Sequence, residues 1–401
     1  MKPHTDTAHA IVSYDWAPKI GGAHSWLYEV YRQWPAPVRV LTVQASADAA
    51  TAASERAFDA RDHGSLALHR SAQPFTQLSL LSPGCVARFV AHARALRRLT
   101  LPAKHTLVHA LRSWPEGFTG LLCKRLYRNV KLVTYAHGED ILIARLSTQL
   151  RWMAQRVYAG ADLVIANSES TRRIVLELAP SAKIVCIAPG VDANSFVVPD
   201  GQIAECRASW GWSQGTVVVG TVARMEARKN QAGVLRAIAE LRRGGVDVAY
   251  VCAGDGQERA ALTQLASELG IADRVRFPGP VSEAQKRLLF ASVDIHAMPS
   301  VQIGEMIEGF GIVFLEAAAA GVPSICGDSG GQTEAVKNGE TGLVVDGRDP
   351  ANIAAALRTL TVDSELRHRM GRNGRRWAAD FDWARVRART LEATAALAKA
   401  P

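Results

Sequence analysis

Short apolar runs alternate with longer mixed stretches along the whole chain. Runs such as Leu163–Ala166 and Thr216–Val222 carry apolar side chains at nearly every position, which is typical of strands buried in a parallel sheet. The stretch from residue 23 to about residue 32 is instead expected to form a helix. This alternation predicts an α/β architecture built on parallel sheets. The expected strands are Ala10–Tyr14, Val38–Val43, Thr106–His109, Lys131–Tyr135, Leu163–Ala166, Lys183–Ile187, Thr216–Val222, Val246–Cys252, Val275–Phe277, Val293–Met298, Ser324–Cys326 and Gly342–Val345.

The length of 401 residues favours two domains, because a single hydrophobic core rarely grows that large. The segment 189–200 contains Pro189-Gly190 and Pro199-Asp200, which are turn-forming pairs that interrupt regular structure. We therefore expect one Rossmann-like domain over residues 1–195 and a second over residues 196–380. A final helix is expected over residues 381–401.

Composition places the chain among globular proteins, with 48% hydrophobic and 21% charged residues. The most apolar run, Gly309–Cys326, is interrupted by Glu316, so no membrane-spanning segment is expected. The N-terminus lacks the apolar core of a secretion signal, and the cysteines are scattered without a Cys-x-x-Cys pair. These features lead us to expect reduced thiols, no zinc site and a cytoplasmic location.

The positive charge is concentrated in the first half of the chain. Residues 1–197 contain 23 Lys and Arg against 14 Asp and Glu, whereas the remainder contains 24 of each, so the first half carries the whole net charge of +9. Around Arg88 and Arg94, apolar residues recur at helical spacing, which predicts a basic amphipathic helix. This helix is either a solvated surface helix or one that contacts anionic lipid headgroups. Nucleic acid is disfavoured, because the basic residues are not interleaved with aromatic residues that stack on bases.

Two glutamates bracket the predicted start of a helix in the second half. The helix is expected to begin near Gly311 and to end before Gly321, which suits a C-terminal cap. Glu308 then lies in the loop at the mouth of the helix, and Glu316 lies in its second turn. Because the first amide groups of a helix have no partner within the helix, they attract anions such as a diphosphate. The candidate phosphate-binding element is therefore Gly309, Phe310, Gly311 and Ile312.

Two cations follow the first expected strand of the second half. Arg224 and Lys229 come shortly after Thr216–Val222, and such a pair can stabilise the charge of a departing diphosphate without a metal. The alternative is a pair of exposed charges at the start of a helix. Arg228, beside Lys229, makes the identity of the second cation ambiguous.

Small or polar residues follow other expected strands, and the carboxyl ends of parallel strands form the ligand-binding edge of a sheet. Gly21 and Gly22 follow the first strand, and Gly254 follows Val246–Cys252. A glycine there lets the backbone approach a ligand, although a tight turn needs it equally. Polar candidates for the same edge are His137, His109, Glu116, Asn167 and Ser168.

Together, Glu308 and Glu316, the Arg-x4-Lys pair and the His137-Gly138 element resemble the signature of retaining family 4 glycosyltransferases, also called glycosyl transferases group 1. The resemblance runs from Gly21-Gly22 to Gly342-Leu343. It implies a GT-B fold, in which two Rossmann-like domains face a central cleft and a C-terminal helix crosses back to the first domain. The first domain is implied to bind the acceptor and the second to bind the nucleotide sugar.

The same resemblance implies a role for each site residue. Glu308 contacts hydroxyls of the donor sugar, His137 lies beside that sugar, and Glu316 holds the nucleotide ribose. Arg224 and Lys229 bind the leaving diphosphate. No metal and no cofactor are expected, since Arg224 and Lys229 can stabilise the charge of the departing diphosphate without a metal.

The implied reaction moves a sugar from a nucleotide diphosphate to an acceptor hydroxyl with retention at the anomeric carbon. GDP-mannose is favoured as the donor, because the segment Ile307–Gly311 is similar to that of mannosyl-type members. A lipid-linked or saccharide acceptor is expected, in cell-envelope polysaccharide or glycolipid synthesis at the inner face of the membrane. The alternatives are a catalytically silent nucleotide-sugar-binding subunit, a sugar-nucleotide epimerase or a phosphorylase. A dehydrogenase is disfavoured, because no Gly-x-Gly-x-x-Gly follows the first strand.

Overall fold

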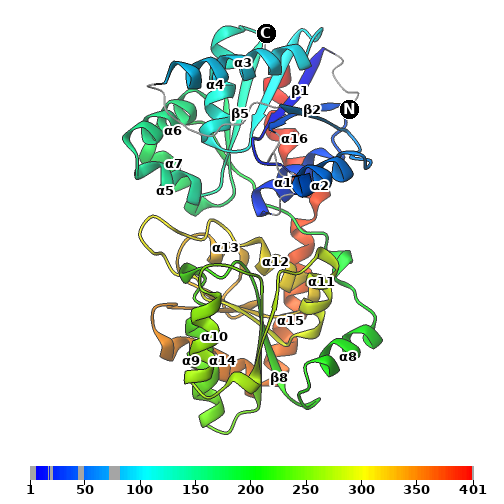
Figure 1. Cartoon of the computed structure of the whole chain (residues 1–401), viewed down its shortest axis with the longest axis vertical. Helices are drawn as coiled ribbons and strands as arrows, with labels where there is room; N and C mark the ends of the chain where they lie inside the picture. Colours follow the sequence, from blue (N-terminus) through cyan, green and yellow to red (C-terminus); the bar gives the residue numbers. More distant parts are fainter. Residues whose placement is uncertain (1–5, 17, 19–20, 44–48, 72–81, 400–401) are drawn as a thin grey trace. The chain divides into compact units, whose positions relative to one another are not determined.

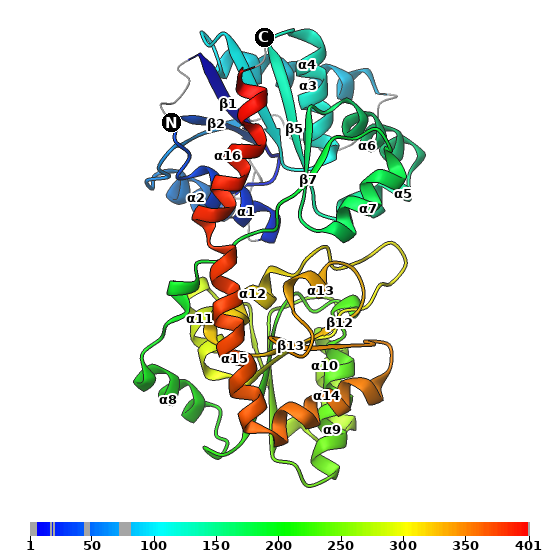
Figure 2. The same ribbon diagram turned by 180° about the vertical axis from the view of Figure 1, so that it is seen from behind.

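The computed structural model describes residues 6–16, 18, 21–43, 49–71 and 82–399. The chain divides into two compact units, one of Met1–Pro189 with Trp383–Pro401 and the other of Gly190–Asp382. Each unit is built around a parallel sheet flanked by helices (Figures 1 and 2). The α/β architecture predicted from the apolar runs is confirmed.

The first unit contains a seven-stranded parallel sheet in the order β3-β2-β1-β4-β5-β6-β7. Successive side chains of β1 alternate between its faces, so that Ala10 and Val12 pack into one hydrophobic cluster and Ile11 into another. The strands are β1 (Thr7–Val12), β2 (Val38–Val43), β3 (Leu66–Ser71), β4 (His105–Ala110), β5 (Val130–Ala136), β6 (Leu163–Ala166) and β7 (Ile184–Cys186). The helices are α1 (Gly22–Tyr31), α2 (Ala49–Asp59), α3 (Pro83–Leu99), α4 (Phe118–Leu126), α5 (Glu139–Arg145), α6 (Thr148–Gly160), α7 (Glu169–Leu178) and α16 (Trp383–Lys399).

The second unit contains a six-stranded parallel sheet in the order β10-β9-β8-β11-β12-β13. Its strand order reverses between β8 and β11, as that of the first sheet does between β1 and β4, and such a reversal opens a crevice at the strand ends. The strands are β8 (Val217–Val222), β9 (Val248–Ala253), β10 (Val275–Gly279), β11 (Ile295–Met298), β12 (Ser324–Gly327) and β13 (Gly342–Val345). The helices are α8 (Asp200–Ser209), α9 (Gln231–Arg243), α10 (Arg259–Glu268), α11 (Glu283–Ser292), α12 (Ile312–Ala320), α13 (Gln332–Ala335), α14 (Pro350–Val362) and α15 (Ser364–Ala378).

Two differences from the expected strands have clear physical reasons. The first strand ends at Val12 rather than Tyr14, because its pairing with β4 runs only from Thr7 to Val12. The strand β3 was not expected, since half of Leu66–Ser71 is polar; it lies at the edge of the sheet, where it pairs with β2 alone. The other expected strands are confirmed to within two residues at each end.

The last helix, α16, belongs to the first unit, as the predicted return of the chain requires. It packs beside α1 and β4, and Val386 joins the same hydrophobic cluster as Ile11. Near its end, the Thr7 hydroxyl donates a hydrogen bond to the Ala398 carbonyl oxygen at 3.0 Å. Among the described helices, none combines the length and apolar character that a bilayer crossing requires.

Gly371 allows α15 to pack closely against the end of helix α12. A Cβ atom built on Gly371 would lie 2.0 Å from the carbonyl oxygen of Gly321, the left-handed residue that ends α12. We expect Gly371→Ala to lower the free energy of unfolding by about 2 kcal/mol or more, because the two helices must separate. Gly201→Ala in α8 is the matched control, since its Cβ meets no atom within 4 Å. Urea unfolding measures both, and equal stabilities would contradict the packing described.

Candidate active site

The loop after β8 is held in place by Asn230, which caps α9. Asn230 has a left-handed backbone with φ of 58°, and its side-chain oxygen accepts from the Gly233 amide. Its side-chain nitrogen donates to the carbonyl oxygens of Pro299 at 3.2 Å and Gly347 at 2.7 Å. One side chain therefore joins the segments that follow β8, β11 and β13.

Gln332 fixes the segments after β11 and β12 in the same way. Its Oε1 atom accepts from the amides of Ser300 at 3.2 Å and Gly327 at 3.0 Å. Its Nε2 atom donates to the carbonyl oxygens of Ser300 at 3.0 Å and Ser329 at 2.7 Å. Gln332 is fully buried, so the loop that leads to Glu308 begins from a rigid base.

The backbone of Glu308 is held from two sides. Its carbonyl oxygen accepts from the Gly331 amide at 3.0 Å, and a Cβ on Gly330 would lie 2.2 Å from the same oxygen. On the other side, Arg228 Nη1 lies 3.4 Å from the Ile307 carbonyl oxygen. These contacts determine where the Glu308 side chain can point.

The Glu308 carboxylate lies between two cations. Its Oε2 atom pairs with Lys229 Nζ and lies 3.3 Å from Arg228 Nη1, and only 12% of its side chain is exposed. Burial by itself raises the pKa of Glu308, but Lys229 and Arg228 outweigh burial and hold the pKa below its ordinary value. The group is therefore a carboxylate at neutral pH, able to accept hydrogen bonds from hydroxyl groups.

The two predicted cations differ in their surroundings. Lys229 contacts Glu308 directly, whereas Arg224 is largely exposed and lies 2.6 Å from Glu226. Arg228, which the sequence left ambiguous, is buried and lies 3.0 Å from Glu226 and within reach of Glu308. The only sequence signal for Arg228 was its position beside Lys229.

The helix α12 begins and ends where the sequence predicts. Gly311 precedes it with φ of +85°, and a Cβ there would lie 2.6 Å from the Phe314 ring. Because Gly311 has no side chain, the first turn has no side-chain cap, and its amides suit an anion. Ile312 is half-buried and Gly309 is buried. The Phe310 side chain is 3% exposed and packs against Phe381, which leaves its backbone amide as the group that would face an anion.

Glu316 lies within α12, and its side chain is 13% exposed. Its Oε1 atom lies 2.6 Å from the Nζ atom of Lys286 on α11. Burial raises the pKa of Glu316, and Lys286 opposes this effect only in part. No local pattern in the sequence singles out Lys286.

Gly254 serves the packing of two loops. Its φ is +127°, and a Cβ would lie 2.0 Å from the Ala223 carbonyl oxygen, so the turn after β9 rests directly on the loop that carries Arg224. A Cβ built on Gly256 would likewise lie 2.3 Å from the Met225 carbonyl oxygen. This contact accounts for Gly254 without a ligand, as the alternative interpretation of this glycine allowed.

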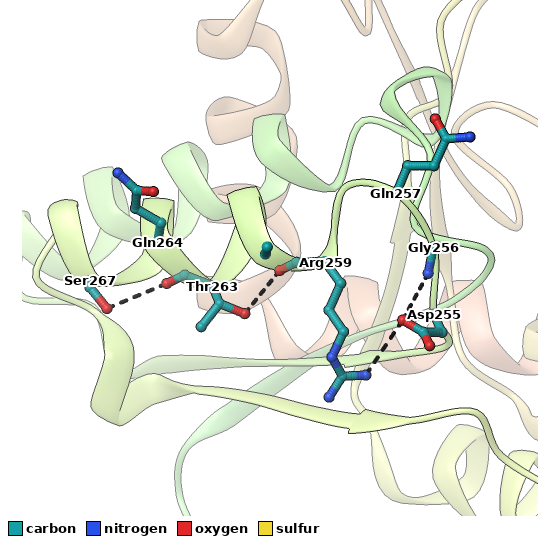
Figure 3. Close-up of a pocket in the computed structure, with 8 residues that line it drawn as sticks. Asp255, Gly256, Gln257, Arg259, Thr263, Gln264 and Ser267 are labelled. Carbon is teal, nitrogen blue, oxygen red and sulfur yellow. Dashed lines mark hydrogen bonds and ion pairs between the residues drawn. The ribbon is translucent and has the colours of Figure 1, made fainter.

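Beyond Gly256, a shallow hollow runs along α10 (Figure 3). Asp255 and Arg259 form a 3.9 Å ion pair at one end, and the hydroxyls of Thr263 and Ser267 donate to carbonyl oxygens of their own helix. Gln257 and Gln264 point away from that ion pair. Because the polar groups of the hollow do not converge, it is not a candidate site.

In the first unit, His137 follows β5 and is held by three contacts. Its ring Nε2 donates to the Leu111 carbonyl oxygen at 2.8 Å, its amide donates to Asp140 at 3.1 Å, and its carbonyl oxygen accepts from Asn167 at 3.1 Å. Burial is the largest effect on this imidazole and lowers its pKa. A neutral ring that donates through Nε2 leaves Nδ1 as an acceptor.

Gly21 and Gly22, the other two candidates of the first unit, lie at the start of helix α1, which packs against His137 through Trp26. The Trp26 ring contacts His137 edge-on, with centroids 5.6 Å apart. Gly21 precedes α1 and supplies no side-chain cap, and a Cβ on Gly22 would meet no described atom within 4 Å. The described protein atoms therefore do not require glycine at position 22, whereas a closely approaching ligand would.

The other polar candidates of the first unit are structural. His109 lies inside β4, where it contacts His9 at 3.2 Å and the Tyr31 hydroxyl at 2.6 Å. It is fully buried, so its assignment to the ligand-binding edge was wrong. Ser168 caps α7, since its hydroxyl accepts from the Thr171 amide at 3.0 Å.

Glu116, in the turn after β4, is a buried carboxyl group. Its Oε1 atom accepts from the Tyr14 amide at 3.2 Å, and its Oε2 atom has no hydrogen-bond partner among the described atoms. Burial, the largest effect, raises its pKa to about 7, although the nearby Arg112 opposes the rise. Glu116 is thus poised to change its charge near neutral pH.

This raised pKa predicts a pH-dependent stability. The folded protein keeps the Glu116 proton up to about pH 7, whereas the unfolded chain releases it near the ordinary value of 4.5. Unfolding therefore releases a proton between these values, and the free energy of unfolding falls as the pH rises. Glutamine cannot ionise, so the stability of Glu116→Gln relative to the wild type should rise by at most about 3 kcal/mol from pH 5 to pH 8. Urea unfolding at both pH values tests this, and a constant difference would contradict it.

Two protein families match the chain over separate ranges. The family described as Glycosyl transferases group 1 matches residues 202–377, and the family described as Glycosyltransferase Family 4 matches residues 18–195. The first match contains Arg224, Lys229, Glu308 and Glu316, and the second contains His137, Gly21 and Gly22.

Individual relatives are similar over most of their length. The chain is 36% identical over 282 residues to the GDP-mannose-dependent alpha-(1-6)-phosphatidylinositol monomannoside mannosyltransferase of Mycolicibacterium smegmatis, covering 69% of this chain and 73% of the relative. It is 32% identical over 333 residues to the D-inositol 3-phosphate glycosyltransferase of Nocardia farcinica, covering 78% and 71%. Among solved structures, Anabaena HepE in complex with UDP and glucose has a TM-score of 0.78 at 24% identity, covering 97% of this chain and 99% of that one. This likeness shows a shared GT-B fold.

Proposed function

Because the chain belongs to family 4 of the glycosyltransferases (glycosyl transferases group 1), whose enzymes are retaining, we propose that it transfers mannose from GDP-mannose to an acceptor hydroxyl. Support for GDP-mannose comes from the mannosyltransferase of Mycolicibacterium smegmatis and from the Ile307–Gly311 segment. The acceptor we propose is a lipid-linked inositol or saccharide, in cell-envelope glycolipid or polysaccharide synthesis at the inner face of the membrane. Both relatives described above are named for inositol-containing compounds.

The observation that carries the proposal is the Glu308 carboxylate, held ionised between Lys229 and Arg228 at the mouth of α12. Carboxylates accept hydrogen bonds from sugar hydroxyls, so Glu308 is proposed to orient the donor sugar. Lys229 and Arg224, with the amides of Gly309–Ile312, are proposed to bind the diphosphate and to stabilise the charge that develops as it leaves.

The remaining residues complete the proposed donor site. Glu316 is proposed to accept hydrogen bonds from the ribose hydroxyls. In the first unit, the Nδ1 acceptor of His137 is proposed to contact the sugar, and Gly21 and Gly22 to give a phosphate access to the backbone. The chemistry proposed for these groups uses hydrogen bonds and charge alone.

A product analysis tests the proposal. The protein would be incubated with GDP-mannose and, in separate reactions, phosphatidylinositol, myo-inositol or a methyl mannoside, and the products identified by mass spectrometry. We expect one mannosylated product and GDP. If no sugar is transferred from GDP-mannose, UDP-sugars or ADP-sugars to any of the three acceptor classes, the proposal is wrong.

The basic helix predicted in the first half is present as α3. Its apolar side, with Phe89 and Leu96, is buried, and Arg94 and Arg98 are exposed. On α6, Trp152 is 43% exposed, lies beside Arg156 and contacts Phe118, which also packs against Phe89. We propose that this face of α3 and α6 contacts anionic lipid. Flotation with anionic liposomes should show binding at low salt that weakens at high salt, and its absence at low salt would exclude the contact.

A further inference from the structure

We propose that Lys286 is a positioning residue of the donor site, which holds the Glu316 carboxylate ionised and in one orientation for the ribose hydroxyls. The inference rests on the proposed function, because it concerns how strongly the nucleotide is bound. It assigns a role to a residue that neither the paired-glutamate motif nor the Arg-x4-Lys pair contains.

Lys286 reaches from α11 to α12. Its Nζ atom lies 2.6 Å from Glu316 Oε1 and 2.9 Å from Glu283 Oε2. The start of α11 is fixed by a capping box between Ser282 and Gln285, one position before Lys286. The backbone that carries Lys286 is therefore anchored, and its ammonium group is held by the two carboxylates.

The two carboxylates beside Lys286 are not equivalent. The Glu283 side chain is 61% exposed and can be hydrated, whereas Glu316 is 13% exposed and Lys286 is 15% exposed. A buried carboxylate without a partner is strongly destabilised, so Glu316 depends on Lys286 far more than Glu283 does. The positive charge of Arg287, also on α11, lowers the pKa of Glu316 as well, but less than Lys286 does.

Ionisation decides what Glu316 can offer a ligand. A carboxylate provides acceptors only, which matches two neighbouring ribose hydroxyls, whereas a protonated acid replaces one acceptor with a donor. Burial already pushes the pKa of Glu316 upward, and Lys286 limits that rise. Removing the ammonium group should therefore raise the pKa of Glu316 further, favour its protonated form and weaken nucleotide binding.

The substitution Lys286→Met removes the charge and keeps most of the stem. Glu283→Gln is the matched control, because it alters the exposed partner of the same lysine. Lys286→Arg keeps the charge and should restore most of the affinity. The variant Lys286→Met could leave Glu316 unpaired and so fail to fold. In that case the double variant Lys286→Met, Glu316→Gln removes the buried charge as well. It should bind the nucleotide weakly, and with the same affinity at every pH.

Calorimetric titration with GDP, UDP and ADP at pH 6, 7, 8 and 9 tests the inference. For the nucleotide that the wild type binds, Lys286→Met should weaken binding by about 10- to 100-fold at pH 7, as expected for loss of a charge-assisted contact of about 1.5–3 kcal/mol. The loss should shrink as the pH rises, because Glu316 then ionises without help. In turnover assays KM should rise and kcat should change little, since the ribose does not react.

Two results overturn the inference. A folded Lys286→Met variant with the affinity of the wild type would show that Glu316 needs no partner. A loss of equal size at every pH would show that Lys286 acts only in packing. If the wild type itself binds none of the three nucleotides, the proposed function fails first and the inference fails with it.

Discussion

Replacing Glu308 by glutamine is expected to lower sugar transfer by about 10²–10³-fold, as the loss of a preorganised contact at a reaction centre does. The neutral amide keeps the size of the side chain, but it replaces one acceptor with a donor and no longer balances Lys229 and Arg228. The donor sugar is then both held more weakly and oriented wrongly.

The control for this substitution lies in the same loop. Glu305→Gln alters a residue in the turn between Ile303 and Met306 and should leave transfer within about twofold of the wild type, as surface substitutions usually do. Circular dichroism and urea unfolding establish that both variants are folded. Comparable activity of Glu308→Gln and Glu305→Gln would contradict the role given to Glu308.

The second large effect is expected at Lys229. Lys229→Met should lower kcat by about 10²–10³-fold, because a cation that stabilises the departing diphosphate acts mainly in the transition state. Removing Lys229 also removes the main group that opposes the effect of burial on the pKa of Glu308, so that pKa should rise. Part of the lost activity should therefore return as the pH is raised.

Arg236→Met is the matched control for charge. Arg236 is an exposed residue of the nearby helix α9, so its loss changes the net charge equally without touching the site. Its kcat should stay close to that of the wild type. A Lys229→Met variant in which only KM rises would show that the lysine stabilises the bound donor and the transition state to the same extent. That result would contradict the assignment of Lys229 to the leaving diphosphate.

Much of the fold could be predicted, because a short apolar run bounded by turn residues fits few structures other than a buried strand. β2, β6 and β13 match their expected bounds, since each is apolar or nearly so between clear breaks. β3 escaped prediction because His69 and Arg70 interrupt its pattern at the sheet edge.

The candidate site was predictable where it follows from local geometry. Gly311 and Gly321 set the ends of α12, and both have the left-handed backbone that glycine adopts easily. Contacts between distant residues were not predictable. Lys229 and Glu308 are 79 positions apart, and they meet because the chain returns to place β11 beside β8.

The same limit explains what the sequence did not show. The glycines beside Phe310 do not tell where its ring packs, and Phe381 supplies the core partner. His109 was expected at the end of a strand, but β4 continues to Ala110 and buries it beside Tyr31. Lys286 carries no local signal, because its partner Glu316 is 30 positions away.

Nucleoside diphosphate release from GDP-, UDP- and ADP-sugars, measured for the wild type and Glu308→Gln with a membrane-lipid extract as acceptor source, tests the central claim most directly. We expect GDP to be released from GDP-mannose by the wild type and release to be nearly abolished in the variant. Release from no donor, or equal release by the two proteins, would contradict the assignment of this site as the donor site of a glycosyltransferase.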